Sequence, residues 1–225
     1  MLTPATPYKN IQIASEAFIN EMLQQKTLYV TGNNVDMAVL NKWQQYWASQ
    51  PLTELKSDDQ KLAFWINIYN GVTIFFIIQL QLKVHMREDL HFFDGYFLQF
   101  DQYELSLDAI EHGILRKNKD VHFDNDAAFL ALQVHQFNYQ IHFALNCGGL
   151  SCPSIHVYQA NTIQQQLQTV TTQFVTDNFL IDDEHQTITC NAIFNWYKND
   201  FENKYLNDSL YKNYRINIID YNWNF

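Results

Sequence analysis

The feature that most constrains this chain is a run of 19 residues without a charge, from Leu62 to Leu80. A run of that length is long enough to cross a bilayer as a helix. Asn67, Asn70 and Thr73 interrupt it, and on a helix residues three apart fall on the same side. One narrow polar seam on an apolar rod is typical of a helix buried in a globular core, because unpartnered amides are costly in hydrocarbon. The sequence therefore predicts a long buried central helix and no membrane partner.

Length and charge narrow the class of protein further. The 225 residues, 47% of them hydrophobic, are enough for a single soluble globular domain spanning residues 1–225. Asp and Glu outnumber Lys and Arg by 24 to 14, which gives a net charge of −10. Binding to a phosphate backbone relies on dense positive charge, and the sequence has no basic run. Nucleic acid is therefore not expected as a partner.

The cysteines and the N-terminus bear on the compartment. Cys147, Cys152 and Cys190 are too few, and odd in number, for a disulfide framework. The first ten residues are polar and contain two prolines, without the charged segment and apolar run of a secretion signal. Both features favour a reducing interior, so we expect a cytoplasmic protein.

Hydrophobic periodicity predicts an α+β fold with a helical first third. Alternating apolar residues favour two short hairpins, over residues 91–106, which hold an Asp94-Gly95 pair, and over 179–190, with a turn at Asp182-Asp183. A strand is expected at 141–146. Besides the central helix, helices are expected at residues 15–26, 36–48 and 106–116, from Asn125 onward, from Asn161 onward, and at 192–201. The expected N-caps are Ser57, Ser106, Asn161 and Asn191.

The richest stretch for chemistry runs from His142 to Pro153, where a histidine, two cysteines and a glycine pair lie within twelve residues. A thiol nucleophile needs an exposed position and a base or positive field that favours the thiolate. A strand that ends in Cys147-Gly148-Gly149 supplies that position, and glycines let backbone amides turn toward an oxyanion. On a straight strand, however, Cys147 points away from His142 and is an ordinary core cysteine. Only a bend near Asn146 brings thiol and imidazole together.

Two other interpretations of this stretch stay open. His142, Cys147, Cys152 and His156 have the residue types of a zinc site, but four ligands within fifteen residues are cramped for a tetrahedron. Cys147 and Cys152 are alternatively a redox pair, although the familiar Cys-x-x-Cys spacing is absent. We therefore expect neither a bound metal nor another cofactor.

A second constellation lies between Ser106 and Arg116. Glu111 and His112 are adjacent on an expected short helix, and either can orient or deprotonate a reacting group. The structural alternative is a helix with acids at its start and Arg116 at its end, which satisfies the helix dipole.

Three motifs together carry a family resemblance. Residues 61–70 (KLAFWINIYN), 105–116 (LSLDAIEHGILR) and 142–153 (HFALNCGGLSCP) occur in that order, and Trp196-Tyr197 with Asp200-Phe201 also fits. Over roughly Asp36 to Phe201 the chain resembles the domain of unknown function 547 family, which has no assigned activity. The resemblance implies that family members keep a cysteine at the position of Cys147 more regularly than at that of Cys152. This favours Cys147 as a nucleophile over a site with two thiols. The chain departs from the family at residues 138–140, where Asp-Pro-Arg is usual, and at His156, where Arg is common.

The leading hypothesis is a thiol-dependent hydrolase or acyl transferase that acts on an unidentified small molecule or peptide. Cys147 attacks, His142 is the base, Asn146 orients, and Glu111 assists. The residues expected to line the pocket are Asn67, Asn70, His112, Arg116, Gly148, Gly149, Ser151 and Cys152. The rival hypothesis is a non-catalytic interaction module in which the same polar residues form a buried hydrogen-bond network.

Overall fold

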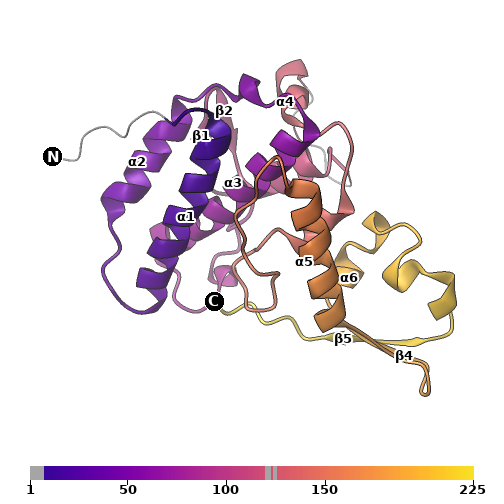
Figure 1. Cartoon of the computed structure of the whole chain (residues 1–225). Coiled ribbons are helices and arrows are strands. Elements are labelled where there is room, and N and C mark those ends of the chain that lie inside the picture. The colour runs from indigo at the N-terminus through magenta and orange to yellow at the C-terminus, as the bar shows by residue number, and fades with distance from the viewer. Residues whose placement is uncertain (1–7, 120–122, 124–125) are drawn as a thin grey trace.

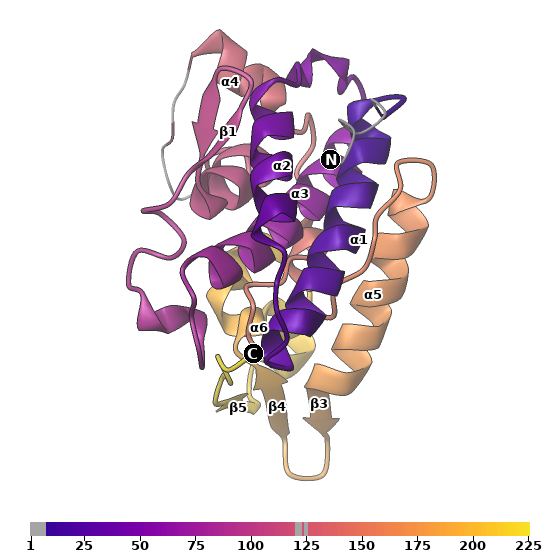
Figure 2. The same cartoon turned by 90° about the vertical axis from the view of Figure 1, so that its left-hand side faces the viewer.

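The computed structural model describes residues 8–119, 123 and 126–225, and it has the expected α+β fold (Figure 1). Helices α1 (Ile11–Val30), α2 (Met37–Ala48) and α3 (Asp58–Gln79) form its N-terminal third. Figures 1 and 2 show α1 running alongside α2 and α3. Aromatic rings join the three helices, because Trp47 of α2 contacts both Phe18 of α1 and Phe64 of α3, each at 5.7 Å between ring centroids.

Helix α3 is the buried central helix that the uncharged run predicts. Its N-cap Ser57 accepts a hydrogen bond from the backbone N–H of Gln60 in a capping box, as expected. Every residue from Lys61 to Ile78 is buried. By length and composition α3 could cross a membrane, but 94% of the relevant window is buried inside the structure, so the interpretation as a core helix is confirmed. A Cβ at Gly71 would overlap the ring of Phe18, so glycine permits the close approach of α1.

Two small sheets follow the central helix. Strands β1 (Leu98–Phe100) and β2 (Tyr103–Leu105) pair antiparallel inside the first expected hairpin. Their connection is at Asp101 and Gln102, and the Asp94-Gly95 pair belongs to an earlier turn in which the Gly95 N–H bonds to the His91 carbonyl.

The second sheet has the order β3-β4-β5. Strands β3 (Phe179–Asp182) and β4 (Thr187–Asn191) form the second expected hairpin, which is confirmed. Strand β5 (Arg215–Ile219) pairs parallel to β4 and was not expected from the sequence. All five of its residues are exposed, so it lacks the alternation of buried and exposed positions that marks a strand on a core.

Outside the three N-terminal helices and the two sheets, the chain forms mostly short helices. The α-helices are α4 (Ala127–Leu132), α5 (Ile163–Asn178) and α6 (Ile193–Trp196), and a π-helix, η3, spans Ala109–Leu115. The 3-10 helices are η1 (Leu52–Glu54), η2 (Met86–Glu88), η4 (Tyr139–Phe143), η5 (Lys198–Asp200), η6 (Tyr205–Asn207) and η7 (Ser209–Tyr211). The N-cap positions of η3 and α6 are Asp108 and Ala192 rather than the expected Ser106 and Asn191. The side-chain oxygens of Ser106 and Asn191 nevertheless accept from the backbone N–H groups of Ala109 and Ile193, the first residues of these helices.

Three local predictions need correction or fall outside the structure. The strand expected at 141–146 is wrong, because this segment begins as the 3-10 helix η4. No strand among the described residues pairs with it; instead, the side chain of Asn70 binds the Ala144 carbonyl and the Asn146 N–H. The cap of α5 is Thr162 rather than Asn161, and it makes no side-chain capping bond. The helix start expected at Asn125 lies outside the described residues, and α4 is capped by Asp126.

Candidate functional site

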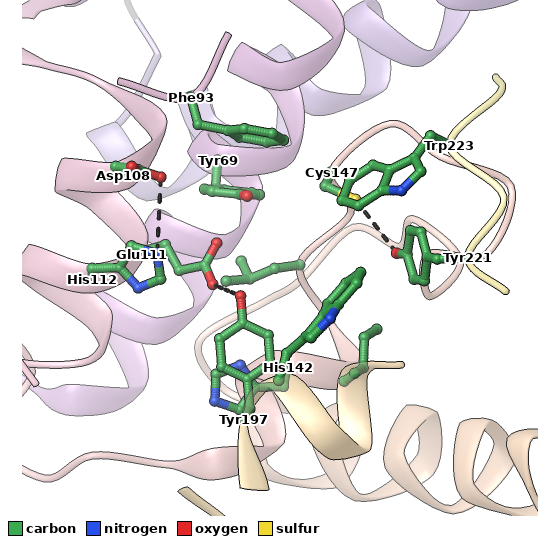
Figure 3. Close-up of a pocket in the computed structure, with 13 residues that line it drawn as sticks. Tyr69, Phe93, Asp108, Glu111, His112, His142, Cys147, Tyr197, Tyr221 and Trp223 are labelled. Carbon is green, nitrogen blue, oxygen red and sulfur yellow. Dashed lines mark hydrogen bonds and ion pairs between the residues drawn. The ribbon is translucent and has the colours of Figure 1, made fainter. Parts of the chain in front are cut away.

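A cavity of about 170 Å³ lies where the central helix, the π-helix and the C-terminal segment meet. Figure 3 shows Asp108, Glu111 and His112 on one side of it and Cys147, Tyr221 and Trp223 on the other. The lining residues are Tyr69, Phe93, Asp108, Glu111, His112, His142, Leu145, Cys147, Ile193, Trp196, Tyr197, Tyr221 and Trp223. The cavity therefore brings together both constellations singled out in the sequence.

Glu111 is a buried carboxylate held by tyrosines. One of its oxygens accepts a hydrogen bond of 2.5 Å from the Tyr197 hydroxyl, and the Tyr69 hydroxyl also bonds to it. Burial opposes ionisation of Glu111, but the electrostatic effect of His112 and the tyrosine hydrogen bonds outweigh it and lower its pKa. Burial and Glu111 raise the pKa of both tyrosines well above the ordinary value, so both stay protonated as donors.

The π-helix sets the position of Glu111. Its wider turn is closed by a bond of 2.8 Å from the Arg116 N–H to the Glu111 carbonyl. Arg116 also donates from Nη1 to Nδ1 of His112 at 2.8 Å. Nε2 of His112 lies 3.8 Å from Asp108, so the ring stands between the guanidinium and a carboxylate. Burial and the nearby Glu111 raise the pKa of Asp108, against the effect of His112.

Asp200 anchors the wall behind the cavity, although it is not among the site residues expected from the sequence. It accepts hydrogen bonds from His142 Nε2 at 2.7 Å, Arg116 Nε at 2.8 Å and Lys119 Nζ at 2.6 Å. Burial opposes its ionisation, but these three donors hold the pKa of the carboxyl well below its usual range. Its only signal in the sequence was its fit to the late family motif.

His142 is oriented by Asp200 and stacked on Tyr197. The two rings lie 3.7 Å apart between centroids, at 18° to each other. Burial lowers the pKa of His142 despite the opposing hydrogen bond to Asp200, so we take the imidazole as neutral with its proton on Nε2. Its other nitrogen, Nδ1, is buried and has no hydrogen-bond partner among the described residues. His142 therefore offers a lone pair from a ring that a carboxylate holds in place.

Cys147 is partly exposed on the cavity wall and is paired with Cys152 in a disulfide, the pairing left open as an alternative above. Sγ of Cys147 lies 3.4 Å from the Tyr221 hydroxyl, and that hydroxyl donates to Sγ of Cys152 at 3.0 Å. His142 lines the same cavity, but it is hydrogen-bonded to Asp200, and the described residues show no bond between it and Cys147. The third cysteine, Cys190, is buried, and burial raises its pKa to about 11.

The asparagines of the motifs form hydrogen bonds with backbone groups and do not line the cavity. Asn67 of α3 binds both the N–H and the carbonyl of Tyr158. Asn70, one turn later, binds the Ala144 carbonyl at 3.0 Å and the Asn146 N–H at 2.8 Å. The Asn146 side chain in turn binds the Gly148 N–H and the Pro153 carbonyl. Asn70 and Asn146 together fix the loop that carries Cys147.

The remaining predicted residues are divided between the cavity and its surroundings. His112 lines the cavity, whereas Arg116 lies behind it on Asp200. Gly148 has a φ of +98°, which favours glycine, and its N–H is used by Asn146; Gly149 packs against the backbone of Asn222 and Trp223. Ser151 and Cys152 line a second cavity of about 410 Å³, against α5.

Within the described residues, no three His, Cys, Asp or Glu side chains are grouped so that they could hold a metal ion. In particular, His142 and Cys147 of the alternative zinc set are bonded elsewhere, to Asp200 and Cys152.

The chain matches one family model, described as "Protein of unknown function, DUF547", over residues 52–175, which is more than half of its length. No curated protein and no solved structure matches it. The matched range includes α3, the π-helix and the loop with Cys147, and it ends before Tyr197, Asp200 and the C-terminal wall of the cavity.

Proposed function

The chain belongs to the DUF547 family, and from that premise we propose that it is a thiol-dependent hydrolase or acyl transferase with Cys147 as its nucleophile. One observation carries the proposal. The sulfur of Cys147 lies on the wall of a cavity that also holds the ionised Glu111 and the Asp200-oriented His142. A nucleophile, a held base and an enclosed space are the parts that acyl transfer needs.

In the proposed reaction, the reduced Cys147 thiolate attacks the carbonyl carbon of a substrate held in the cavity. A carbon–sulfur bond forms, the bond to the leaving oxygen or nitrogen breaks, and that atom takes up a proton. The Tyr221 hydroxyl, near both sulfurs, is suited to donate to the thiolate. We assign proton transfer at the leaving group or attacking water to Nδ1 of His142, because a neutral imidazole held by a carboxylate is a competent base.

The structure changes the roles first given to two parts of the motif. Asn146 uses its side chain on Gly148 and Pro153, so in this proposal it fixes the loop instead of orienting the base. The Cys147 and Gly148 N–H groups are bonded to Cys152 Sγ and Asn146, so they do not serve an oxyanion while these bonds last. The Tyr69 and Tyr197 hydroxyls, in contrast, are hydrogen-bond donors on the cavity wall, and both bond to Glu111.

The disulfide makes the proposed activity dependent on a reductant. A sulfur in a disulfide is not a thiolate and cannot act as the nucleophile. The enzyme is therefore active only after reduction releases Cys147 from Cys152. Disulfides in the cytoplasm, the location expected from the sequence, are usually transient. Under this proposal the pair is therefore an oxidised resting state.

Trapping the acyl-enzyme tests the proposal. The Cys152→Ser variant, which cannot form the disulfide, is incubated with p-nitrophenyl acetate and its intact mass is measured. We expect one acetyl group on the peptide that contains Cys147, removed by hydroxylamine as thioesters are. The matched Cys147→Ser variant keeps Cys152 and should gain none. Acetylation that is equal in both variants, or absent from both, contradicts the proposal.

The rival function, a non-catalytic interaction module, draws on a different observation. Asn67, Asn70 and Asn146 are buried and engaged with backbone, as a purely structural network requires. Under this alternative the disulfide closes a loop beside Asn146 and the cavity is a recognition pocket. Binding without any covalent intermediate at Cys147 is the result that favours it.

A further inference from the structure

Aromatic side chains make up nearly half of the cavity lining. They are Tyr69, Phe93, Trp196, Tyr197, Tyr221 and Trp223. Three of them form a continuous group, because the Tyr221 ring lies 4.7 Å from Trp196 and 4.6 Å from Trp223 between centroids. The faces of such rings attract cations placed within about 6 Å of the centroid.

Glu111, the carboxylate in this aromatic setting, forms no ion pair with a lysine or arginine among the described residues. Asp200, also buried, is bonded to both Arg116 and Lys119. Glu111 is bonded instead to the neutral hydroxyls of Tyr197 and Tyr69. Lysine and arginine are absent from the described residues that line the cavity. One side of the cavity wall therefore carries a negative charge that tyrosine hydroxyls hold in place, without an ion pair to lysine or arginine among the described residues.

Two buried acceptors in the lining have unused hydrogen-bonding capacity. Nδ1 of the buried His142 has a lone pair with no partner among the described residues. The Glu111 carboxylate has room for more than the two tyrosine hydroxyls, because it offers about four lone-pair positions. A ligand that suits this lining brings positive charge and N–H donors together.

We propose that the cavity binds a primary ammonium group of the substrate, at the end of an alkyl chain like that of an alkylamine or a lysine side chain. The inference deepens the proposed function, and rests on it only in calling the ligand a substrate. The volume of about 170 Å³ suits such a group, since an engineered cavity of roughly 150 Å³ holds a benzene molecule. Cys147, across the cavity from Glu111, is then placed to attack a carbonyl further along the ligand (Figure 3).

A pair of isosteric probes tests this inference. The oxidised wild-type chain is titrated with n-butylammonium chloride and with 1-butanol at constant ionic strength, and tryptophan fluorescence is recorded. Trp196 and Trp223 report on the cavity, whereas the other three tryptophans are fully buried elsewhere. We expect n-butylammonium to bind about tenfold more tightly than 1-butanol, from charge attraction and cation–π contact. Equal affinities of the two probes, or tighter binding of 1-butanol, would overturn the inference.

Two variants locate the effect. Glu111→Gln keeps the shape of the side chain and should remove most of the preference for the cation, whereas Glu184→Gln, in the exposed β3–β4 turn, should keep it. If Glu111→Gln does not fold, Trp196→Leu replaces it, because Trp196 is 48% exposed and its loss is tolerable for the core. In Trp196→Leu we expect the preference for n-butylammonium over 1-butanol to fall severalfold. An unchanged preference in the folded variant contradicts the site.

Repeating the titration with Cys147→Ser separates this inference from the proposed function. Binding needs no thiol, so the preference should persist in that variant. A cation preference without any thioester in the trapping experiment would defeat the acyl-transfer proposal and leave the ammonium site standing. A thioester on Cys147 without a cation preference would defeat the ammonium site alone.

Discussion

Replacing Asp200 with asparagine is expected to lower the free energy of unfolding by about 3–5 kcal/mol, the cost of breaking a buried ion pair from one side. The substitution keeps the shape of the side chain but removes the charge that holds Arg116 and Lys119. It also leaves Nε2 of His142 facing an amide in place of a carboxylate. Urea unfolding of the variant measures the loss, and the exposed Asp220→Asn should change stability by under about 0.5 kcal/mol.

The same variant has a defined pH dependence. The pKa of Asp200 is lowered on folding, so its contribution is fully present above the unfolded-state value of about 3.9 and is lost as the pH falls through the folded-state value. The stability gap between wild type and Asp200→Asn should therefore be widest near neutral pH and shrink in acid below about pH 4. If wild type and Asp200→Asn have equal free energies of unfolding at pH 7, the charge of Asp200 does not stabilise this wall.

Replacing Asn70 with alanine is expected to destabilise the fold and to misplace Cys147. The change leaves the Ala144 carbonyl and the Asn146 N–H without their partner in a buried setting. Each unsatisfied group costs about 1–3 kcal/mol, so we expect a loss of about 2–5 kcal/mol in urea unfolding. After reduction, the rate at which iodoacetamide modifies Cys147 should also change, because Asn70 fixes the loop immediately before it.

Asn67→Ala is the matched control for Asn70. It lies one turn earlier on α3 and loses the same two kinds of bond, but to Tyr158. We expect a similar loss of stability with the reactivity of Cys147 unchanged. Equal effects of both variants on Cys147 would mean that general loosening, rather than the Asn70 contact, controls the thiol.

Local features were the ones that the sequence predicted well. Ser57 caps the central helix, and Ser106 and Asn191 bond to the first residues of η3 and α6, because such bonds reach only two or three positions along the chain. The central helix was also predictable, since its apolar run and polar seam depend only on its own residues. The position of the polar seam was predicted correctly, but the role of its side chains was not. Asn70 hydrogen-bonds to the backbone of a residue 74 positions later in the chain.

The site depends on contacts that no spacing encodes. His142 and Asp200 are 58 residues apart, and Glu111 and Tyr197 are 86 apart. The strand predicted at residues 141–146 failed for the same reason, because the Asn70 side chain replaces a strand partner for that backbone. The cysteine pair was open to prediction only as one alternative, since five-residue spacing permits a disulfide without requiring one.

The central claim is that Cys147 is a reactive sulfur facing the cavity. Its most direct test is the rate at which iodoacetamide alkylates the folded Cys152→Ser variant. Cys152→Ser is reduced and treated at pH 7, and the modified peptides are quantified by mass. Cys190 is the internal control, because it is buried and burial raises its pKa to about 11. We predict rapid modification of Cys147, slowed by n-butylammonium, with Cys190 untouched until the protein unfolds. Modification of both cysteines only on unfolding would contradict the claim.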